Sequence, residues 1–128
     1  MRRLLVDTHV LLWWLMDSDS LGVKAKSLIA NSKNIVFVSA ATAWEISIKK
    51  SLGKLDAPDD MEEIILQEGF SPLPITLFHG QQAGALPSLH RDPFDRMLVA
   101  QAQAEGLAIL SADKVLNNYG IKVIDACV

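Results

Sequence analysis

Four acidic residues at widely separated positions in this 128-residue sequence could bind a metal ion together: Asp7, Glu45, Asp95 and Asp113. Carboxylates that share one cleft repel one another, and they are costly to bury without a cation. A hard divalent cation, Mg²⁺ or Mn²⁺, prefers oxygen ligands and keeps water molecules that leave room for a phosphate substrate. Such a set of residues therefore suits a metal-dependent reaction at a phosphate group.

The elements that must position these acids follow from the hydrophobic pattern. Short apolar runs alternate with longer helical patterns, which predicts an α/β fold: a three-layer α/β/α sandwich with a mostly parallel central sheet. The expected strands are residues 4–6, 35–38, 73–75, 107–110 and 121–124. The expected helices are residues 8–16, 21–32, 40–52, 59–68, 77–85 and 93–105, with a helical turn at 114–118.

The predicted topology brings the four acids to one edge of the sheet. Asp7 and Asp113 follow the first and fourth strands, so both lie at the carboxyl edge. Glu45 and Asp95 lie in the early turns of helices that begin at this same edge. Ligands of such folds bind beyond the carboxyl ends of the strands. We therefore expect the acids to meet in one binding site.

Each acid also has a simpler interpretation as part of a helix start. Asp7 and Asp113 could cap the helical segments that follow them. The run from Asp92 to Asp95 reads as an N-cap, a proline at the first helical position and a favourable acid in the first turn. The run from Thr42 to Glu45 matches a capping box, which would start that helix later than residue 40. From spacing alone, caps and a joint metal site both stay open.

Composition limits the class of protein. The 12 Lys and Arg against 15 Asp and Glu give a net charge of −3, which excludes a highly basic protein held to nucleic acid by bulk charge. The length and the 50% hydrophobic content predict a single domain over residues 1–128. Cys127 is the single cysteine, which favours a cytoplasmic protein. The apolar run at residues 10–16 is too short to span a bilayer, so no membrane association is expected.

The sequence resembles the PIN-domain nucleases, and specifically the VapC-like toxins of bacterial and archaeal toxin–antitoxin pairs. The stretches that carry the resemblance are residues 5–9 (LVDTH) with 11–13 (LLW), 39–54 (SAATAWEISIKKSLGK), 92–102 (DPFDRMLVAQA) and 106–113 (GLAILSAD). They cover much of the chain in the order and spacing of the family. The resemblance implies a PIN fold, a metal-dependent endoribonuclease acting on RNA with Mg²⁺ or Mn²⁺, a homodimer, and inhibition by a cognate antitoxin.

The resemblance also assigns roles to residues. The four acids of the family match Asp7, Glu45, Asp95 and Asp113, while Asp92 remains the helix cap. We expect Asp7 and Asp95 to bind the metal directly. Glu45 and Asp113 are expected to complete the metal site, orient water and help remove a proton. The sequence leaves open whether one ion or two are bound.

Other residues are candidates for holding the substrate. Thr8 and Ser111 match the small hydroxyl positions that line such sites. Arg96, which adjoins Asp95, is the best candidate for a phosphate contact, although it could equally meet an antitoxin carboxylate. Further basic candidates are Lys49, Lys50, Lys54 and Arg91.

Two other functions stay open. A phosphoacceptor receiver-like signalling domain would have a similar length, the same α/β alternation and an acidic Mg²⁺ pocket. Against it, Asp7 has no acidic neighbour, and Thr76 rather than an aspartate follows the third predicted strand. A catalytically silent PIN-like binding module would keep the fold without the chemistry, and the complete acidic set argues against that function.

Overall fold

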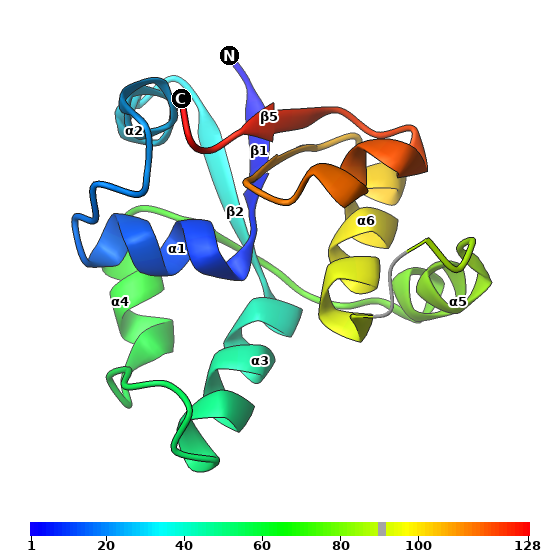
Figure 1. The fold of residues 1–128 in the computed structure, drawn as a ribbon, viewed down its shortest axis with the longest axis horizontal. Coiled ribbons are helices and arrows are strands. Elements are labelled where there is room, and N and C mark those ends of the chain that lie inside the picture. The colour runs from blue at the N-terminus through cyan, green and yellow to red at the C-terminus, as the bar shows by residue number, and fades with distance from the viewer. Residues whose placement is uncertain (90–91) are drawn as a thin grey trace.

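A five-stranded sheet organises the part of the chain that the computed structural model describes, residues 1–89 and 92–128 (Figure 1). Its strands are β1 Arg3–Val6, β2 Ile35–Ser39, β3 Ser71–Leu73, β4 Ala108–Ser111 and β5 Val123–Asp125. Their order across the sheet is β3-β2-β1-β4-β5, and every neighbouring pair is parallel. The prediction of a mostly parallel sheet is confirmed.

Helices cover both faces of this sheet. They are α1 Thr8–Leu15, α2 Val23–Ala30, α3 Ala40–Ser51, α4 Met61–Gln67, α5 Leu77–Ala85, α6 Pro93–Glu105 and the 3₁₀ helix η1 Lys114–Tyr119. In Figure 1, α1, α2 and α4 lie on one side of the sheet, and α5 and α6 lie on the other. Among the described residues, no helix is both long and apolar enough to cross a membrane.

The side chains of β1 explain why both faces are covered. Leu4 and Val6 are buried in one core, which includes residues of α1, α2 and α4. Leu5 is buried in a second core on the opposite face, with residues of α5 and α6. Successive side chains of a strand point to opposite faces, so a strand that is apolar throughout needs a layer of helices on each side. The three-layer α/β/α prediction is confirmed.

The third strand lies two residues before its predicted position. The structure places β3 at Ser71–Leu73, paired with Phe37–Ser39 of β2. The prediction of 73–75 followed the apolar character of Ile75, but that side chain is 38% exposed and contributes nothing to the sheet. Pro74, which has no N–H to donate, directly follows the strand. The helix expected at 59–68 likewise begins later, at Met61.

The order of the strands creates a switch point between β1 and β4. From β1 the chain adds β2 and then β3 on one side, and it then returns to place β4 and β5 on the other side of β1. The carboxyl ends of β1 and β4 are held together beyond the strands, since the backbone N–H of Asp7 donates to the carbonyl of Leu110 at 3.2 Å. Open α/β sheets bind ligands at such a point.

Gly106 provides a test of how α6 ends. It follows the helix in the left-handed conformation, with φ of 67°, which costs glycine less than other residues. Apart from Gly106 itself and its two chain neighbours, no atom of the described residues lies within 4 Å of the position that a Cβ would take. We therefore expect Gly106→Ala to lower the free energy of unfolding by about 1 kcal/mol through backbone strain alone. Denaturant titration measures this, and Gly106→Asn should lose less. An equal or larger loss with asparagine would contradict the explanation.

Candidate active site

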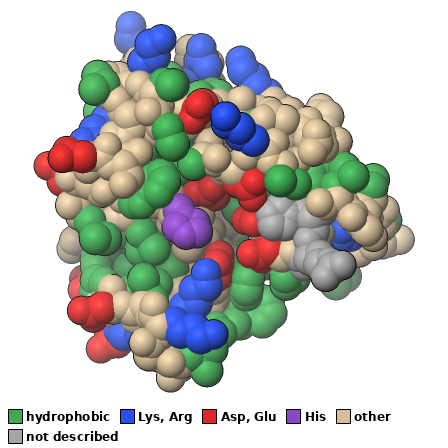
Figure 2. Space-filling model, viewed as in Figure 1, with side chains coloured by type: hydrophobic (Ala, Val, Ile, Leu, Met, Phe, Trp, Pro, Cys, Tyr) green, Lys and Arg blue, Asp and Glu red, His purple; other side chains and the backbone are tan. Residues whose placement is uncertain are grey.

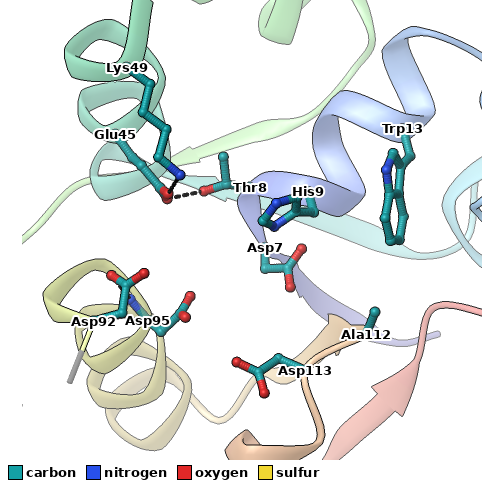
Figure 3. A pocket seen from close by; sticks show the side chains of 10 residues that line it. All are labelled: Asp7, Thr8, His9, Trp13, Glu45, Lys49, Asp92, Asp95, Ala112 and Asp113. Atoms are coloured by element: carbon teal, nitrogen blue, oxygen red, sulfur yellow. Dashed lines mark hydrogen bonds and ion pairs between the residues drawn. The ribbon is translucent and has the colours of Figure 1, made fainter. Parts of the chain in front are cut away.

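A cleft of about 350 Å³ lies at the switch point, and acidic side chains line it. Among its lining residues are all four acids predicted from the sequence and a fifth acid: Asp7, Glu45, Asp95, Asp113 and Asp92. Figure 2 shows acidic side chains gathered in the hollow at the centre of this face, beside a histidine and basic side chains. Figure 3 shows that the acids come from the ends of strands and the starts of helices and point toward a shared space.

Asp7 connects β1, α1 and β4. Its Oδ1 accepts a hydrogen bond from the backbone N–H of Val10 at 2.9 Å, which caps α1, and its Oδ2 accepts one from the hydroxyl of Ser111. The residue is 6% exposed. Burial raises the pKa of the Asp7 carboxyl, because desolvation penalises the charged form more than these two hydrogen bonds favour it. Asp7 is therefore both the helix cap and a carboxylate that a cation would stabilise.

Ser111 positions carboxylates from beneath the cleft. Its Oγ donates to Asp7 and accepts a hydrogen bond from the backbone N–H of Asp113 at 3.0 Å. The side chain is buried, and Ser111 is not among the residues that line the cleft. From its sequence position, this hydroxyl is predicted to line the substrate site. In the structure it instead holds the two acids that follow β1 and β4.

Glu45 is held from both sides by side chains of the protein. Its Oε1 accepts a hydrogen bond from Thr8 Oγ1 at 2.6 Å, and its Oε2 accepts one from Lys49 Nζ at 2.6 Å. Thr42 Oγ1 lies 3.3 Å from Thr8 Oγ1. Glu45 is 4% exposed, so both carboxylate oxygens depend on these donors.

The start of α3 decides between the two interpretations of Glu45. The hydroxyl of Ser39 accepts from the backbone N–H of Ala41 at 3.0 Å and caps a helix that begins at Ala40. The capping box suggested by Thr42 to Glu45 is therefore wrong. Glu45 lies in the second turn, with its carboxylate directed into the cleft.

Asp92 and Asp113 both cap helices and line the cleft. Asp92 accepts hydrogen bonds from the backbone N–H groups of Phe94 at 2.8 Å and Asp95 at 3.4 Å at the start of α6. Asp113 accepts from the N–H of Val115 at 3.0 Å at the start of η1. The two interpretations of the sequence are thus compatible, because the helix starts themselves form the rim of the cleft. Asp92 was identified from the sequence only as a cap.

Lys49 is the basic side chain that the described structure brings into the cleft. The hydrogen bond to Glu45 raises the pKa of its ammonium group, with smaller contributions from the charges of Asp92 and Asp95. From the sequence, Lys49 is a candidate only for a phosphate contact. The signal for its pairing was present, because a glutamate four residues before a lysine lies beside it on a helix.

The other basic candidates lie elsewhere. Lys50 forms an ion pair with Asp59, and neither residue lines the cleft. Lys54 is exposed beyond the end of α3. Arg91 lies outside the described residues.

Arg96, the best candidate for a phosphate contact from the sequence, is not among the described residues that line the cleft. Its guanidinium donates hydrogen bonds to the carbonyls of Ala83 at 2.9 Å, Leu86 at 3.0 Å and Pro87 at 2.9 Å. These carbonyls lie at and just beyond the end of α5, so Arg96 joins α5 to α6. Its neighbour Asp95 lies on the cleft side, because adjacent residues of a helix point about 100° apart.

The residues of the cleft suit a hard divalent cation by their chemistry. Most of its lining side chains that could bind a metal offer oxygen atoms, and no cysteine is among the described residues that line it. Within residues 1–89 and 92–128, no three His, Cys, Asp or Glu side chains stand close enough to hold an ion in their present positions. Mg²⁺ needs fewer than three such side chains, since it binds through one or two carboxylates and completes its coordination shell with water and phosphate oxygens. The carboxylates of the cleft fit that mode of binding.

Comparison with known proteins relates this chain to a family. A family model described as PIN domain matches residues 4–122. No curated protein matches the sequence. Similar solved structures include VapBC2 from Rickettsia felis bound to a DNA fragment from its promoter, with TM-score 0.69, 13% identity, and coverage of 95% of this chain and 97% of that chain.

Two further solved structures have the same fold. DNA-bound VapBC from Salmonella typhimurium has TM-score 0.64 and 16% identity, and the match covers 99% of this chain and 100% of that chain. A toxin–antitoxin complex from Klebsiella pneumoniae has TM-score 0.63 and 18% identity, with coverage of 95% and 96%. At these identities the likeness establishes the fold.

The buried carboxyl of Asp7 gives a test by pH. Its pKa is raised in the folded state, so the folded protein binds this proton more tightly than the unfolded chain does. Stability from Asp7 is therefore fully present below its unfolded pKa and is lost as the pH rises through the folded pKa. We expect Asp7→Asn to raise the melting temperature of the metal-free protein by a few degrees at pH 7, and to have little effect in acid, where Asp7 is itself neutral.

Thermal unfolding in EDTA across the acidic to neutral range measures this difference. Asp19→Asn, at an exposed position, is the matched control and should leave the melting temperature unchanged. A melting temperature that falls in Asp7→Asn at pH 7 would contradict the argument from burial.

Arg96 gives a test of the contact between α5 and α6. Lysine keeps the charge but cannot donate to three carbonyls from a planar fork. We expect Arg96→Lys to lower the free energy of unfolding by about 1–3 kcal/mol, since hydrogen bonds from charged donors are the stronger ones. Denaturant titration measures the loss. Wild-type stability in Arg96→Lys would mean that these bonds do not hold α5 in place.

Proposed function

The chain belongs to the PIN domain family, whose model matches residues 4–122, and from this premise we propose that it is the metal-dependent endoribonuclease of a toxin–antitoxin pair. The observation that carries the proposal is the convergence of Asp7, Glu45, Asp95 and Asp113 in one cleft at the switch point of the sheet. Mg²⁺ or Mn²⁺ is the cofactor that this set of oxygen ligands suits.

In this function the acids divide into two groups. Asp7 and Asp95 would hold the metal, and Glu45 and Asp113 would complete the site. When bound, the ion would supply positive charge to offset the charge that builds on a phosphodiester under attack, and it would acidify a water molecule. The hydrogen bonds from Ser111 and from the N–H of Val10 fix both oxygens of Asp7, which keeps the carboxylate in one orientation.

Glu45 and Asp113 are the residues we assign to orienting water and accepting its proton. Glu45 lines the cleft, and the hydrogen bond from the Thr8 hydroxyl sets the position of its carboxylate. We therefore assign Thr8 a role in positioning Glu45. Asp113 is held by its own backbone contact with Ser111 and by its cap of η1. Such contacts support the assignment, because a general base must be held within hydrogen-bond reach of the proton that it accepts.

The substrate that we propose is RNA, cut to leave a 5′-phosphate and a 3′-hydroxyl. A protein of net charge −3 gains little from long-range attraction of a polyanion, so binding depends on cations inside the cleft. Lys49 is the lysine among the described residues that line the cleft, and the divalent ion would add to its charge.

A cognate antitoxin and a homodimer complete the proposal. The Klebsiella pneumoniae structure with this fold is a toxin–antitoxin complex, and the Rickettsia felis and Salmonella typhimurium structures are VapBC assemblies bound to DNA. These structures support the proposal of a partner of the same kind for this chain, and the acidic cleft is the site that such a partner would regulate.

Cleavage of labelled RNA by the purified protein tests the function. We expect RNA to be cut with Mg²⁺ or Mn²⁺ and not with EDTA, and DNA of the same sequence to be left intact. Asp7→Asn and Asp95→Asn should each lower the rate at least about a hundredfold, because a ligand of the ion supports several kcal/mol of charge stabilisation. Asp19→Asn is the control and should keep the full rate.

The other outcomes decide between functions. A folded wild-type protein that cuts no RNA with either ion would support the catalytically silent binding module. Full activity in Asp95→Asn would refute the assigned metal site, and equal cleavage of DNA would refute RNA as the preferred substrate.

A further inference from the structure

We propose that Lys49 is a built-in counter-cation of the acidic cleft: its ammonium group occupies Glu45 when no divalent ion is bound, and an entering ion displaces it from that carboxylate. This inference rests on the proposed function, because it presupposes that the carboxylates of the cleft bind metal. It assigns Lys49 a role in metal binding that differs from a simple contact with the substrate.

The contacts of Glu45 carry the first step of the argument. Lys49 Nζ lies 2.6 Å from Glu45 Oε2, and Thr8 Oγ1 lies 2.6 Å from Glu45 Oε1. Both oxygens of a carboxylate that is expected to serve a metal site are thus occupied by donors of the chain itself. A cation that binds through Oε2 competes with the ammonium group for that oxygen.

The position of Lys49 carries the second step. Figure 3 shows its side chain extending from α3 to Glu45 at the edge of the cleft, across from Asp92 and Asp95. A positive charge here lowers the mutual repulsion of the carboxylates. In the metal-free protein the ammonium group therefore partly offsets the repulsion among the carboxylates, and a divalent ion would offset it more strongly.

Burial makes the pair asymmetric. The side chain of Glu45 is 6% exposed, whereas that of Lys49 is 41% exposed. Moving the carboxylate away would break its buried contact with Thr8, but the lysine is on a flexible four-carbon stem at the solvent side and can turn into water. Two cations close together repel, so the divalent ion and the ammonium group exclude one another from Glu45.

Lys50 provides a matched comparison on the same helix. It is the next residue of α3 and also forms an ion pair, with Asp59, whose side chain is 96% exposed. That pair lies outside the residues that line the cleft. Replacing Lys50 removes the same charge and side chain from α3 without altering the contacts of Glu45.

The experiment measures Mn²⁺ binding to the full chain by isothermal titration calorimetry near neutral pH. We expect Lys49→Met to bind Mn²⁺ roughly fivefold to tenfold more tightly than the wild type, because a competing charge has been removed. Lys50→Met should bind within about twofold of the wild type, since Lys50 pairs with Asp59 and does not line the cleft. Lys49→Gln, which keeps a hydrogen-bond donor without the charge, should follow Lys49→Met and serves if the methionine variant does not fold.

Thermal unfolding gives a second readout that does not depend on activity. Without metal, Lys49→Met should melt at a lower temperature than the wild type, because Glu45 is left buried without its ion pair. Mn²⁺ should then raise the melting temperature of Lys49→Met by more than it raises that of the wild type. Equal shifts in the two proteins would overturn the proposal.

The results also separate this inference from the proposed function. Unchanged or weaker binding in Lys49→Met, next to clear binding in the wild type, overturns the counter-cation role alone. A loss of 10–100-fold is the effect of a residue that merely orients a metal ligand. The absence of Mn²⁺ binding in the wild type and in every variant overturns the metal site itself, and the counter-cation role with it.

Discussion

The cost of gathering negative charge in one partly enclosed cleft governs the rest of this structure. Carboxylates brought together away from bulk water repel one another and lose hydration, and only donors or cations can offset both effects. Backbone N–H groups and side chains both supply donors at this site. Helix N-termini supply N–H groups to Asp7, Asp92 and Asp113, and hydroxyls and an ammonium group supply the rest. The acids can be assembled before any metal arrives because these groups hold them.

The topology of the sheet makes this arrangement possible. In a parallel sheet the strands end at a common edge, and the following helices begin there with their positive ends toward the same space. An acid at such a junction satisfies the orphan N–H groups of its helix and also faces the cleft. Capping and metal binding are therefore two uses of one position. Asp7 shows both most directly, because α1 begins in the residue after it.

This coupling explains which features could be predicted from the sequence. The meeting of Asp7, Glu45, Asp95 and Asp113 followed from strand ends and helix starts, which apolar runs locate well. Arg96 could not be placed in this way. Its direction depends on where the end of α5 packs against α6, and the hydrophobic pattern of the sequence does not specify that contact. The position of β3 was missed for a related reason, since a three-residue edge strand is fixed by pairing with β2 rather than by its own pattern.

Lys49 illustrates a different limit of reasoning from sequence. A lysine four residues after a glutamate is ordinarily a solvent-exposed pair of little energetic importance. Burial makes this ion pair different, because the side chain of Glu45 is enclosed whereas that of Lys49 is partly exposed to solvent. Lys50 pairs instead with Asp59, nine residues further along the chain, whose side chain is 96% exposed. The importance of a lysine on α3 therefore depends on how deeply its acidic partner is buried. In a protein of net charge −3 that we propose to act on RNA, the few cations inside the cleft decide whether a phosphate can enter.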